Sequence, residues 1–164
     1  TLCLLFYLGD LVLLASNPEI AYLYKNDISF YQRVKETQLK FKTNSAIIGC
    51  KAATAWELPE TMVTSIEHSL TPLINNQDVK SLNEEDKTDI IICYLACRIA
   101  ELAVFEQTTK VEQMNILNQG ENHHLEFFHI NSMLSDYSLN QVRTLLRAND
   151  FVHRANNLIL KHLN

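Results

Sequence analysis

The stretch NSAIIGCKAATAWELPETMVTSIEHS, residues 44–69, carries most of the structural information in this sequence. Small residues recur in its first half at three- and four-residue steps and predict a helix with a stripe of small side chains on one face: Ala46, Gly49, Cys50 and Ala53. A glycine in mid-helix costs about 1 kcal/mol relative to alanine, so we expect Gly49 where a neighbouring backbone packs closely. The stretch therefore predicts one close helix crossing.

The same stretch contains a helix break at Leu58-Pro59. Proline lacks a backbone N–H and clashes with a helix interior, so it ends one helix and begins the next. Trp56 lies just before this break. We expect its indole to fill the end of the groove beside the small residues and to be buried in the core.

Helix signals also occur on both sides of this stretch, whereas residues typical of hairpin turns are few. Capping residues, prolines and apolar periodicity predict helices over these ranges: 18–24, 28–41, 44–56, 59–69, 81–107, 138–147 and 151–163. The predicted caps of five of these helices are, in order, Asp27, either Thr43 or Asn44, Ser81, Ser138 and Asp150. The apolar opening, residues 1–15, reads as a buried core helix and residues 70–80 as a loop, while residues 111–117 and 123–134 stay ambiguous. We expect 81–107 to be the central core helix, through Ile91, Ile92, Leu95, Ile99 and Leu102.

Length and composition indicate one ordinary globular domain over residues 1–164. Hydrophobic residues make up 47% and charged residues 20%, and only three glycines and three prolines are present. A chain of this length can bury a sufficient core without metal or disulfide staples. The predicted fold class is all-α, a compact multi-helix bundle.

Charge and cysteine spacing restrict the partners and the compartment. The formal net charge of -5 argues against nucleic-acid binding, which requires a basic surface. The four cysteines have no CxxC spacing, as expected for reduced thiols in a cytoplasmic protein: Cys3, Cys50, Cys93 and Cys97. The opening run contains Asp10 and is shorter than the roughly 20 residues of a membrane span. We expect a soluble cytoplasmic protein without a membrane partner.

Residues able to carry chemistry are few, and each has a structural alternative. No phosphate-binding glycine loop, GxSxG or HExxH occurs, so we expect no catalytic residue, metal or cofactor. His68 reads as a surface or capping residue more readily than as a ligand. His123, His124 and His129 do not share one helix face, and Glu101 and Glu106 more simply flank a solvated stripe.

Two further groups have the same two interpretations. Cys93 and Cys97 lie at i, i+4 and would suit a soft metal or a redox pair, but two core thiols are the simpler interpretation. Four aromatic residues between the short helices would suit nucleotide stacking, but packing between helices is the plainer account: Tyr22, Tyr24, Phe30 and Tyr31.

Three blocks of this sequence resemble the bacterial HDOD domains, which are signalling-output members of the HD phosphohydrolase superfamily. Residues 45–70 are similar to the pattern HAxxGxxLxxxWxLPxxIxxAIxxHH, with these matches: Ala46, Gly49, Trp56, Leu58, Pro59 and Ile66. LLFYLGDLVLL, residues 4–14, resembles LLHDIGKLVLL and retains Gly9, and residues 94–102 resemble the xLADxLA helix. The resemblance covers residues 4–102 and leaves 103–164 as C-terminal helices. It implies that further helices of the domain precede Thr1.

The positions that would bind metal in an HD hydrolase are replaced in this chain. The resemblance aligns the His-Asp pair with Phe6 and Tyr7, the second-motif histidine with Ser45, the paired histidines with Ser69 and Leu70, and the later aspartate with Cys97. None of these side chains is a good ligand for a hard cation.

This pattern implies a non-catalytic bacterial signal-transduction module that acts through contacts with other signalling proteins or domains, and it leaves homo-oligomers open. A residual metal-dependent phosphohydrolase, which would recruit ligands from upstream residues, His68 or residues 121–129, is the main alternative. A helical interaction domain unrelated to this superfamily is a third.

Overall fold

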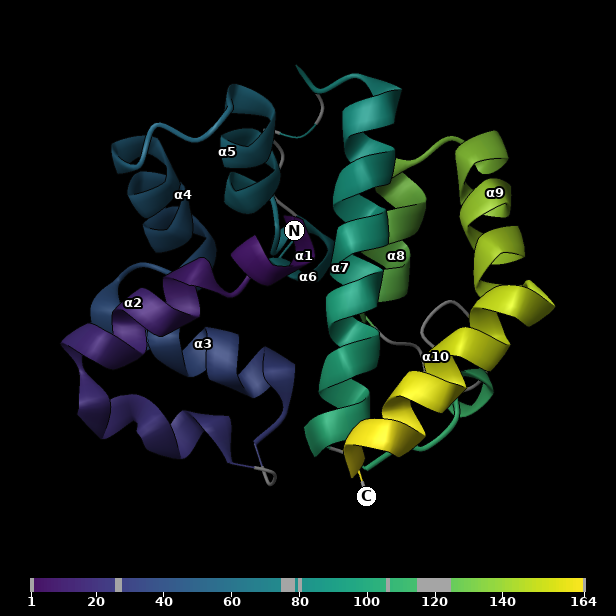
Figure 1. Ribbon diagram of the computed structural model, residues 1–164. Helices are drawn as coiled ribbons and strands as arrows, with labels where there is room; N and C mark the ends of the chain where they lie inside the picture. Colours follow the sequence, from purple (N-terminus) through teal and green to yellow (C-terminus); the bar gives the residue numbers. More distant parts are fainter. Residues whose placement is uncertain are drawn as a thin grey trace. The chain divides into compact units, whose positions relative to one another are not determined.

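The computed structural model describes residues 2–25, 28–74, 79, 81–105, 107–114 and 125–163. All regular structure in these ranges is helical, which confirms the predicted all-α fold class (Figure 1). The span predicted as one domain divides into two compact units, Thr1–Leu70 and Thr71–Asn164, which we call the N-terminal unit and the C-terminal unit. None of the helices in the described ranges is long and apolar enough to cross a membrane.

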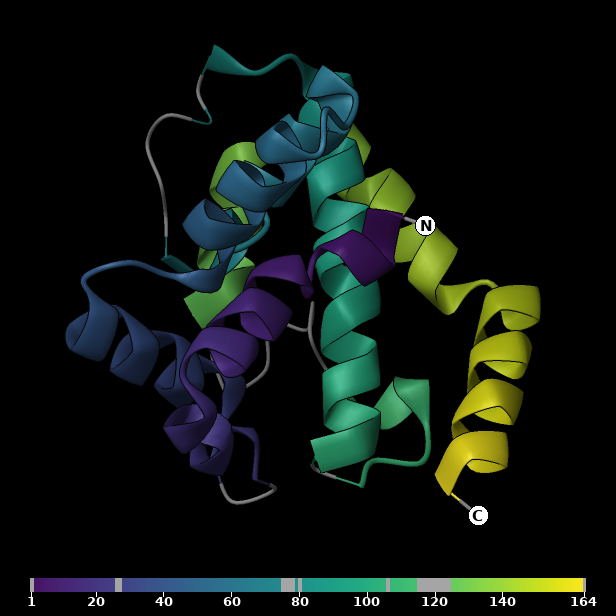
Figure 2. The same ribbon diagram turned by 60° about the vertical axis from the view of Figure 1, so that its left-hand side comes forward.

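The N-terminal unit is a set of short helices (Figures 1 and 2). In chain order they are α1 (Leu2–Leu5), α2 (Leu8–Ser16), the 3-10 helix η1 (Pro18–Tyr24), α3 (Phe30–Phe41), α4 (Ser45–Ala55) and α5 (Glu60–Glu67). Helix α2 packs on α4 and on η1, and α4 also packs on α5. The opening apolar run, predicted as one helix, is thus two helices separated by a turn at residues 6–7.

Side-chain caps explain where α3 and α4 begin. The Asn44 side chain accepts a hydrogen bond from the Ile47 N–H at 3.0 Å, which confirms one of the two predicted starts of α4. For α3 the cap is Ser29, whose hydroxyl accepts from the Gln32 N–H at 3.2 Å. The predicted cap, Asp27, lies outside the described residues.

Two apolar clusters hold the N-terminal unit together. The first joins α2, α4 and α5 through Leu8, Ala53 and Ile66, with the half-buried Leu58 packed against them. The second joins α2 to η1, and its buried members are Leu13, Ile20 and Leu23. Because α2 contributes to both clusters, it is the central element of this unit.

The C-terminal unit contains one long helix and several shorter ones. Its elements are α6 (Thr71–Ile74), α7 (Glu84–Phe105), the 3-10 turn η3 (Val111–Gln113), α8 (Leu125–Met133), α9 (Asp136–Arg147) and α10 (Asn149–Leu163). Within this unit α6 packs on α8, and α10 packs on α7, α9 and η3. The presence of α6 corrects the prediction of a continuous loop over residues 70–80.

Helix α7 supplies much of the core of this unit, as predicted. Ile91, Leu95, Ile99 and Leu102 are all buried, whereas Ile92 lies on the outer side and is 36% exposed. The cap of this helix differs from the prediction, which placed it at Ser81. The Asn83 side chain accepts from the Asp86 N–H at 2.8 Å and donates to the Asp86 carboxylate at 2.7 Å.

Side-chain hydrogen bonds fasten the other elements of the C-terminal unit. Asn156 on α10 accepts from the Val111 N–H at 2.9 Å and donates to the Glu112 carboxylate at 3.0 Å, which holds η3 on α10. Glu84 at the start of α7 accepts from the Ser135 N–H at 2.7 Å. Ser135, rather than the predicted Ser138, caps α9 by accepting from the Ser138 N–H.

Candidate functional site

Most of the positions that resemble HD metal ligands lie next to helix ends, whereas Cys97 lies within α7. In the N-terminal unit, four of them are buried: Phe6 in the turn before α2, Ser45 at the start of α4, and Ser69 and Leu70 directly after α5. Tyr7, the residue before α2, is half-buried, and so is Cys97 on α7 in the C-terminal unit.

The two glycines of the resemblance lie against each other where α2 crosses α4. A Cβ atom added to Gly9 would overlap the Ser45 carbonyl oxygen and lie 2.9 Å from the Gly49 nitrogen. A Cβ atom added to Gly49 would lie 3.1 Å from the Gly9 nitrogen and 3.0 Å from the Ile66 Cγ2 atom. The close helix crossing predicted at Gly49 is confirmed, and Gly9 is its partner.

The small-residue stripe of α4 faces this crossing only in part. Ala46 is 3% exposed and Ala53 is fully buried, whereas Cys50 is half-buried. Burial raises the pKa of the Cys50 thiol, and the negative charge of Glu67 raises it further. A thiol with a raised pKa stays protonated near neutral pH, so Cys50 is a poor nucleophile.

A polar cluster beside the crossing was not predicted. We call it the Asp10 cluster, and it consists of Asp10 on α2, Tyr24 at the end of η1 and Arg33 on α3. The Tyr24 hydroxyl donates to the Asp10 Oδ1 atom at 2.6 Å. The Arg33 guanidinium lies 4.9 Å from the centroid of the Tyr24 ring and 5.0 Å from that of Phe30, and Arg33 is only 2% exposed.

The Asp10 carboxyl is the titratable group of this cluster. Burial raises its pKa, while the hydrogen bond from Tyr24, the charge of Arg33 and a hydrogen bond with Ser45 each lower it, and the net effect is a pKa above the usual aspartate value. Raised carboxyl pKa values occur both in catalytic sites and in buried structural networks. Because Tyr24 bonds Asp10 directly and stacks with Arg33, the geometry is that of a network joining three elements.

The sequence contained one signal for this cluster. Asp10 is the only charged residue in the apolar run over residues 2–16, and a carboxylate inside a buried helix requires a hydrogen-bonding partner. Spacing could not identify that partner, because Tyr24 is 14 residues away. Of the four aromatic residues expected to pack together, Tyr24 and Phe30 stack on Arg33, whereas Tyr22 and Tyr31 are 44% and 47% exposed.

Trp56 is not in the core, which corrects the prediction. It follows the last residue of α4 and is 61% exposed. The buried end of the expected groove is occupied instead by Ile66, which is fully buried, and by the half-buried Leu58. Pro59 is the exposed residue before α5.

Two of the histidines singled out in the sequence, His68 and His129, lie in packed surroundings of the fold. His68, the residue that ends α5, is buried rather than on the surface, and its Nδ1 atom has no hydrogen-bond partner among the described residues. His123 and His124 lie outside the described residues. His129 Nδ1 lies 3.0 Å from the Pro72 carbonyl oxygen, and because a carbonyl only accepts, this ring nitrogen carries the proton. His129 therefore joins α8 to α6.

One acidic residue of α7 is more deeply buried than predicted, and the two cysteines of this helix differ in burial. Glu101 is 6% exposed, so the expectation that it borders a solvated stripe is wrong, and Glu106 lies outside the described residues. Cys93 is buried, which confirms the core-thiol interpretation for that residue, whereas Cys97 is only half-buried, so the interpretation holds for it only in part.

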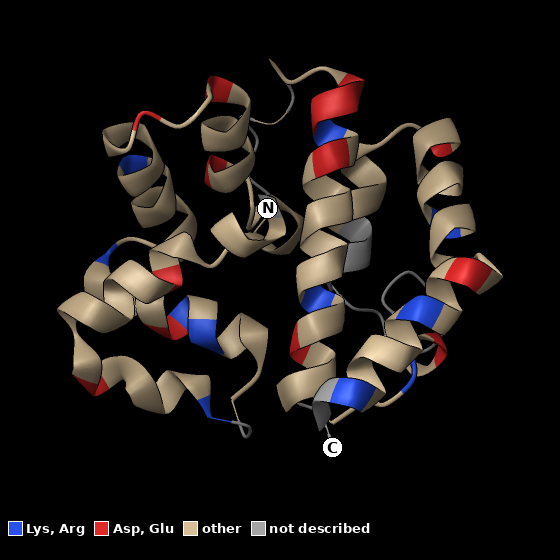
Figure 3. Ribbon diagram, in the orientation of Figure 1, with Lys and Arg blue, Asp and Glu red and all other residues tan. Residues whose placement is uncertain are grey.

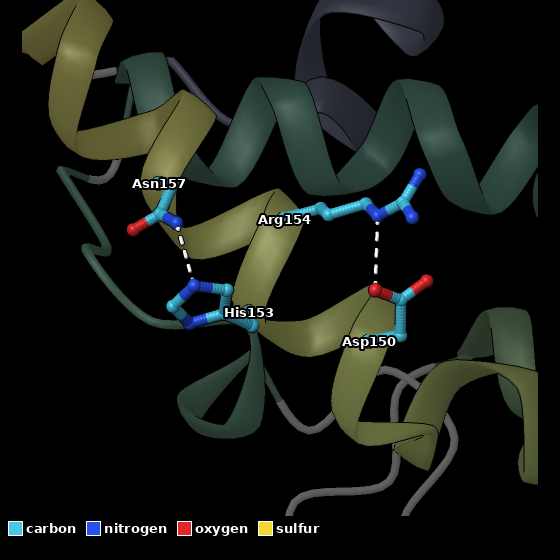
Figure 4. Close-up of polar contacts among 4 residues, drawn as sticks. All are labelled: Asp150, His153, Arg154 and Asn157. Atoms are coloured by element: carbon cyan, nitrogen blue, oxygen red, sulfur yellow. Dashed lines mark hydrogen bonds and ion pairs between the residues drawn. The ribbon is translucent and has the colours of Figure 1, made fainter.

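An Asp-His-Arg grouping on α10 consists of two separate helical pairs (Figure 4). Arg154 Nε donates to Asp150 Oδ1 at 3.0 Å, and Asn157 Nδ2 lies 3.0 Å from His153 Nε2. All four residues are exposed, and the two members of each pair are four residues apart on the helix. Such pairs on one turn of a solvated helix stabilise that helix by a few tenths of a kcal/mol.

No three histidine, cysteine, aspartate or glutamate residues within the described ranges are grouped so that they could hold a metal ion. Comparison of the chain with protein-family models, curated proteins and solved structures finds no match in any of the three. Function has therefore to be inferred from the residues of this chain.

Proposed function

We propose that this chain is a non-catalytic, HDOD-like module of a bacterial signalling protein that works in the cytoplasm through contacts with other proteins. The observation that carries the proposal is the backbone contact between Gly9 and Gly49. Both glycines belong to segments that resemble HD motifs, and the contact gives a physical reason for glycine at both positions. The functional step rests on the family resemblance.

The side chains beside this crossing support a structural rather than a metal-binding role. Phe6 is a buried hydrocarbon where an HD hydrolase has a histidine, and Leu70 replaces another imidazole with an aliphatic side chain. Ser45 directs its carbonyl oxygen against Gly9 at the closest point of the crossing. A metal-bound hydroxide requires about three protein ligands, and these residues offer only weak neutral donors.

A module without catalytic ligands still has a use for this scaffold. The Gly9–Gly49 crossing, the two apolar clusters and the Asp10 cluster all join α2 to its neighbours, so they hold the surface residues of the N-terminal unit in one arrangement. A preorganised surface reduces the entropy lost when a partner binds.

The experiment measures metal and turnover on the same sample. The natural full-length protein is purified without chelators, its bound iron, manganese, zinc and magnesium are quantified, and it is assayed with nucleotides, cyclic dinucleotides and a generic phosphodiester. We expect substoichiometric metal and no turnover. Stoichiometric metal with turnover abolished by chelation would establish the phosphohydrolase instead, and His68→Ala would then test whether His68 is one of its ligands.

A further inference from the structure

The segment from Trp56 to Glu60, which we call the Trp56 loop, exposes the only tryptophan of the chain. The Trp56 side chain is 61% exposed although it lies between two helices that pack on each other. Tryptophan is among the residues that contribute most binding energy at protein interfaces.

Hydrogen bonds to the last turn of α4 and the packing of Leu58 fix the backbone of the Trp56 loop. The N–H groups of Trp56, Glu57 and Leu58 donate to the carbonyls of Ala52, Thr54 and Ala53 at 3.0, 3.0 and 3.1 Å. The Leu58 side chain packs against the cluster of Leu8, Ala53 and Ile66. The backbone that carries Trp56 is thus fixed before any partner arrives, which lowers the entropic cost of binding.

The charged residues of the Trp56 loop and of α5 are all acidic, and the nearest basic residue along the chain is Lys51, exposed on α4. Residues 52–67 contain three acidic residues, Glu57, Glu60 and Glu67, and no lysine or arginine. Glu57 is the neighbour of Trp56 in the loop and Glu60 begins α5, and both are exposed. Figure 3 shows acidic residues in the segment that joins α4 to α5 and at the start of α5.

We propose that the Trp56 loop is a docking site for an arginine-bearing segment of a partner protein. The inference rests on the proposed function, that this module works through protein contacts. Tryptophan is the best aromatic partner for a cation, and a guanidinium is planar enough to stack on indole while its N–H groups pair with a carboxylate. Arginine satisfies both features of the loop, whereas an apolar segment would leave Glu57 and Glu60 beside it without a counter-charge.

The test uses the full chain and three tetrapeptides: tetra-arginine, tetralysine and tetracitrulline, whose ureido groups keep the arginine shape without its charge. Because Trp56 is the sole tryptophan, its emission reports directly on the loop, and calorimetry serves the variants that lack it. We expect tetra-arginine to change the Trp56 emission saturably at or below about 1 mM, a weak but specific affinity. We expect binding to fall steeply with added salt.

Two variants and one control locate the site. Trp56→Ala should weaken tetra-arginine binding at least about fivefold, within the range expected for a lost cation–π contact. The double variant Glu57→Gln/Glu60→Gln should weaken it similarly and flatten its salt dependence. Tyr137→Ala removes an aromatic side chain that is 73% exposed elsewhere and should leave binding unchanged. Circular dichroism establishes that each variant is folded.

Three results would overturn the inference: no saturable binding of tetra-arginine, equal binding of tetracitrulline or tetralysine, or unchanged binding by Trp56→Ala. These results are independent of the metal and turnover assays. Absent turnover with absent arginine binding refutes the docking site alone. Chelator-sensitive turnover refutes the proposed function, whatever the peptides do.

Discussion

The backbone nitrogen of Gly9 lies 3.1 Å from the point that a Cβ atom of Gly49 would occupy, so the two helices that carry these glycines touch backbone to backbone. The contact is reciprocal, because a Cβ atom on Gly9 would reach the Gly49 nitrogen at 2.9 Å and overlap the Ser45 carbonyl oxygen. Close-packed interiors do not absorb an added methyl group without displacing their neighbours.

Gly9→Ala should destabilise the protein more than Gly49→Ala. The new methyl group of Gly9→Ala meets backbone atoms that cannot rotate away, so we expect a loss of about 1 to 3 kcal/mol even though alanine is the better helix former. The methyl group of Gly49→Ala meets the Ile66 side chain at 3.0 Å and the Gly9 nitrogen at 3.1 Å, contacts that need a shift of only a few tenths of an ångström, whereas that of Gly9→Ala overlaps the Ser45 carbonyl. Urea unfolding at pH 7 measures both, and equal or reversed losses would contradict the crossing geometry.

Gly49→Leu should lower the free energy of unfolding by more than about 2 kcal/mol, because three further carbon atoms have to enter the same crossing. The matched control is Ala55→Leu, which adds the same side chain at the exposed end of the same helix. We expect that control to lie within about 0.5 kcal/mol of the wild type. A neutral Gly49→Leu in denaturant titrations would rule out close packing there.

Trp56→Ala should change stability by no more than about 0.5 kcal/mol, since an exposed side chain leaves no cavity when removed. The native protein should emit at a wavelength typical of solvated indole, and acrylamide should quench it efficiently. A blue-shifted native emission maximum, or a loss of about 3 kcal/mol or more in the free energy of unfolding of Trp56→Ala, would show that Trp56 is buried.

Asp10→Asn should make the stability of the N-terminal unit less dependent on pH. The pKa of Asp10 is raised by burial in the folded state, so its contribution is complete below the unfolded value of about 3.9 and is lost as pH rises through the folded pKa. The variant should therefore gain stability relative to the wild type as pH rises from about 4 towards neutrality.

The measurement for Asp10 is urea unfolding across that range, followed by tyrosine absorbance. Asp89→Asn, an exposed position on α7, controls for the general effect of removing one negative charge. A difference between Asp10→Asn and wild type that stays constant with pH, or falls as pH rises, would contradict the raised pKa.

Glu84→Gln should have the opposite dependence. The backbone N–H of Ser135, followed by the Ser135 and Ser138 hydroxyls, lowers the pKa of Glu84. Its contribution is therefore present above the unfolded value of about 4.3 and is lost as pH falls through the folded pKa. Wild type should exceed the variant in stability at pH 7 and approach it under acid. Glu85→Gln, its exposed neighbour, is the control, and equal pH profiles would refute the bond to Ser135.

Much of the helical architecture was predictable because its signals are local. A cap acts over three residues, as Asn44 does with the Ile47 N–H, and a proline ends a helix through its own backbone. Because these signals are local, they do not distinguish between neighbouring residues that could each cap the same helix. Ser135 and Ser138 are both hydroxyl residues near the start of α9, and the structure shows Ser135 as the cap, with its own N–H donating to Glu84, a contact 51 residues away in the chain.

Local patterns were enough to predict the all-α fold class, the start of α4 and a close helix contact at Gly49. The identity of that contact as Gly9, the hydrogen bond of Tyr24 to Asp10 near Arg33, and the exposure of Trp56 became visible only in the folded chain. The physical reason is that contacts between distant segments leave no local pattern. Hydrophobic periodicity shows which residues favour burial, but whether a given side chain is covered depends on segments many residues away. Leu58 and Ile66 occupy the space that the local pattern assigned to Trp56.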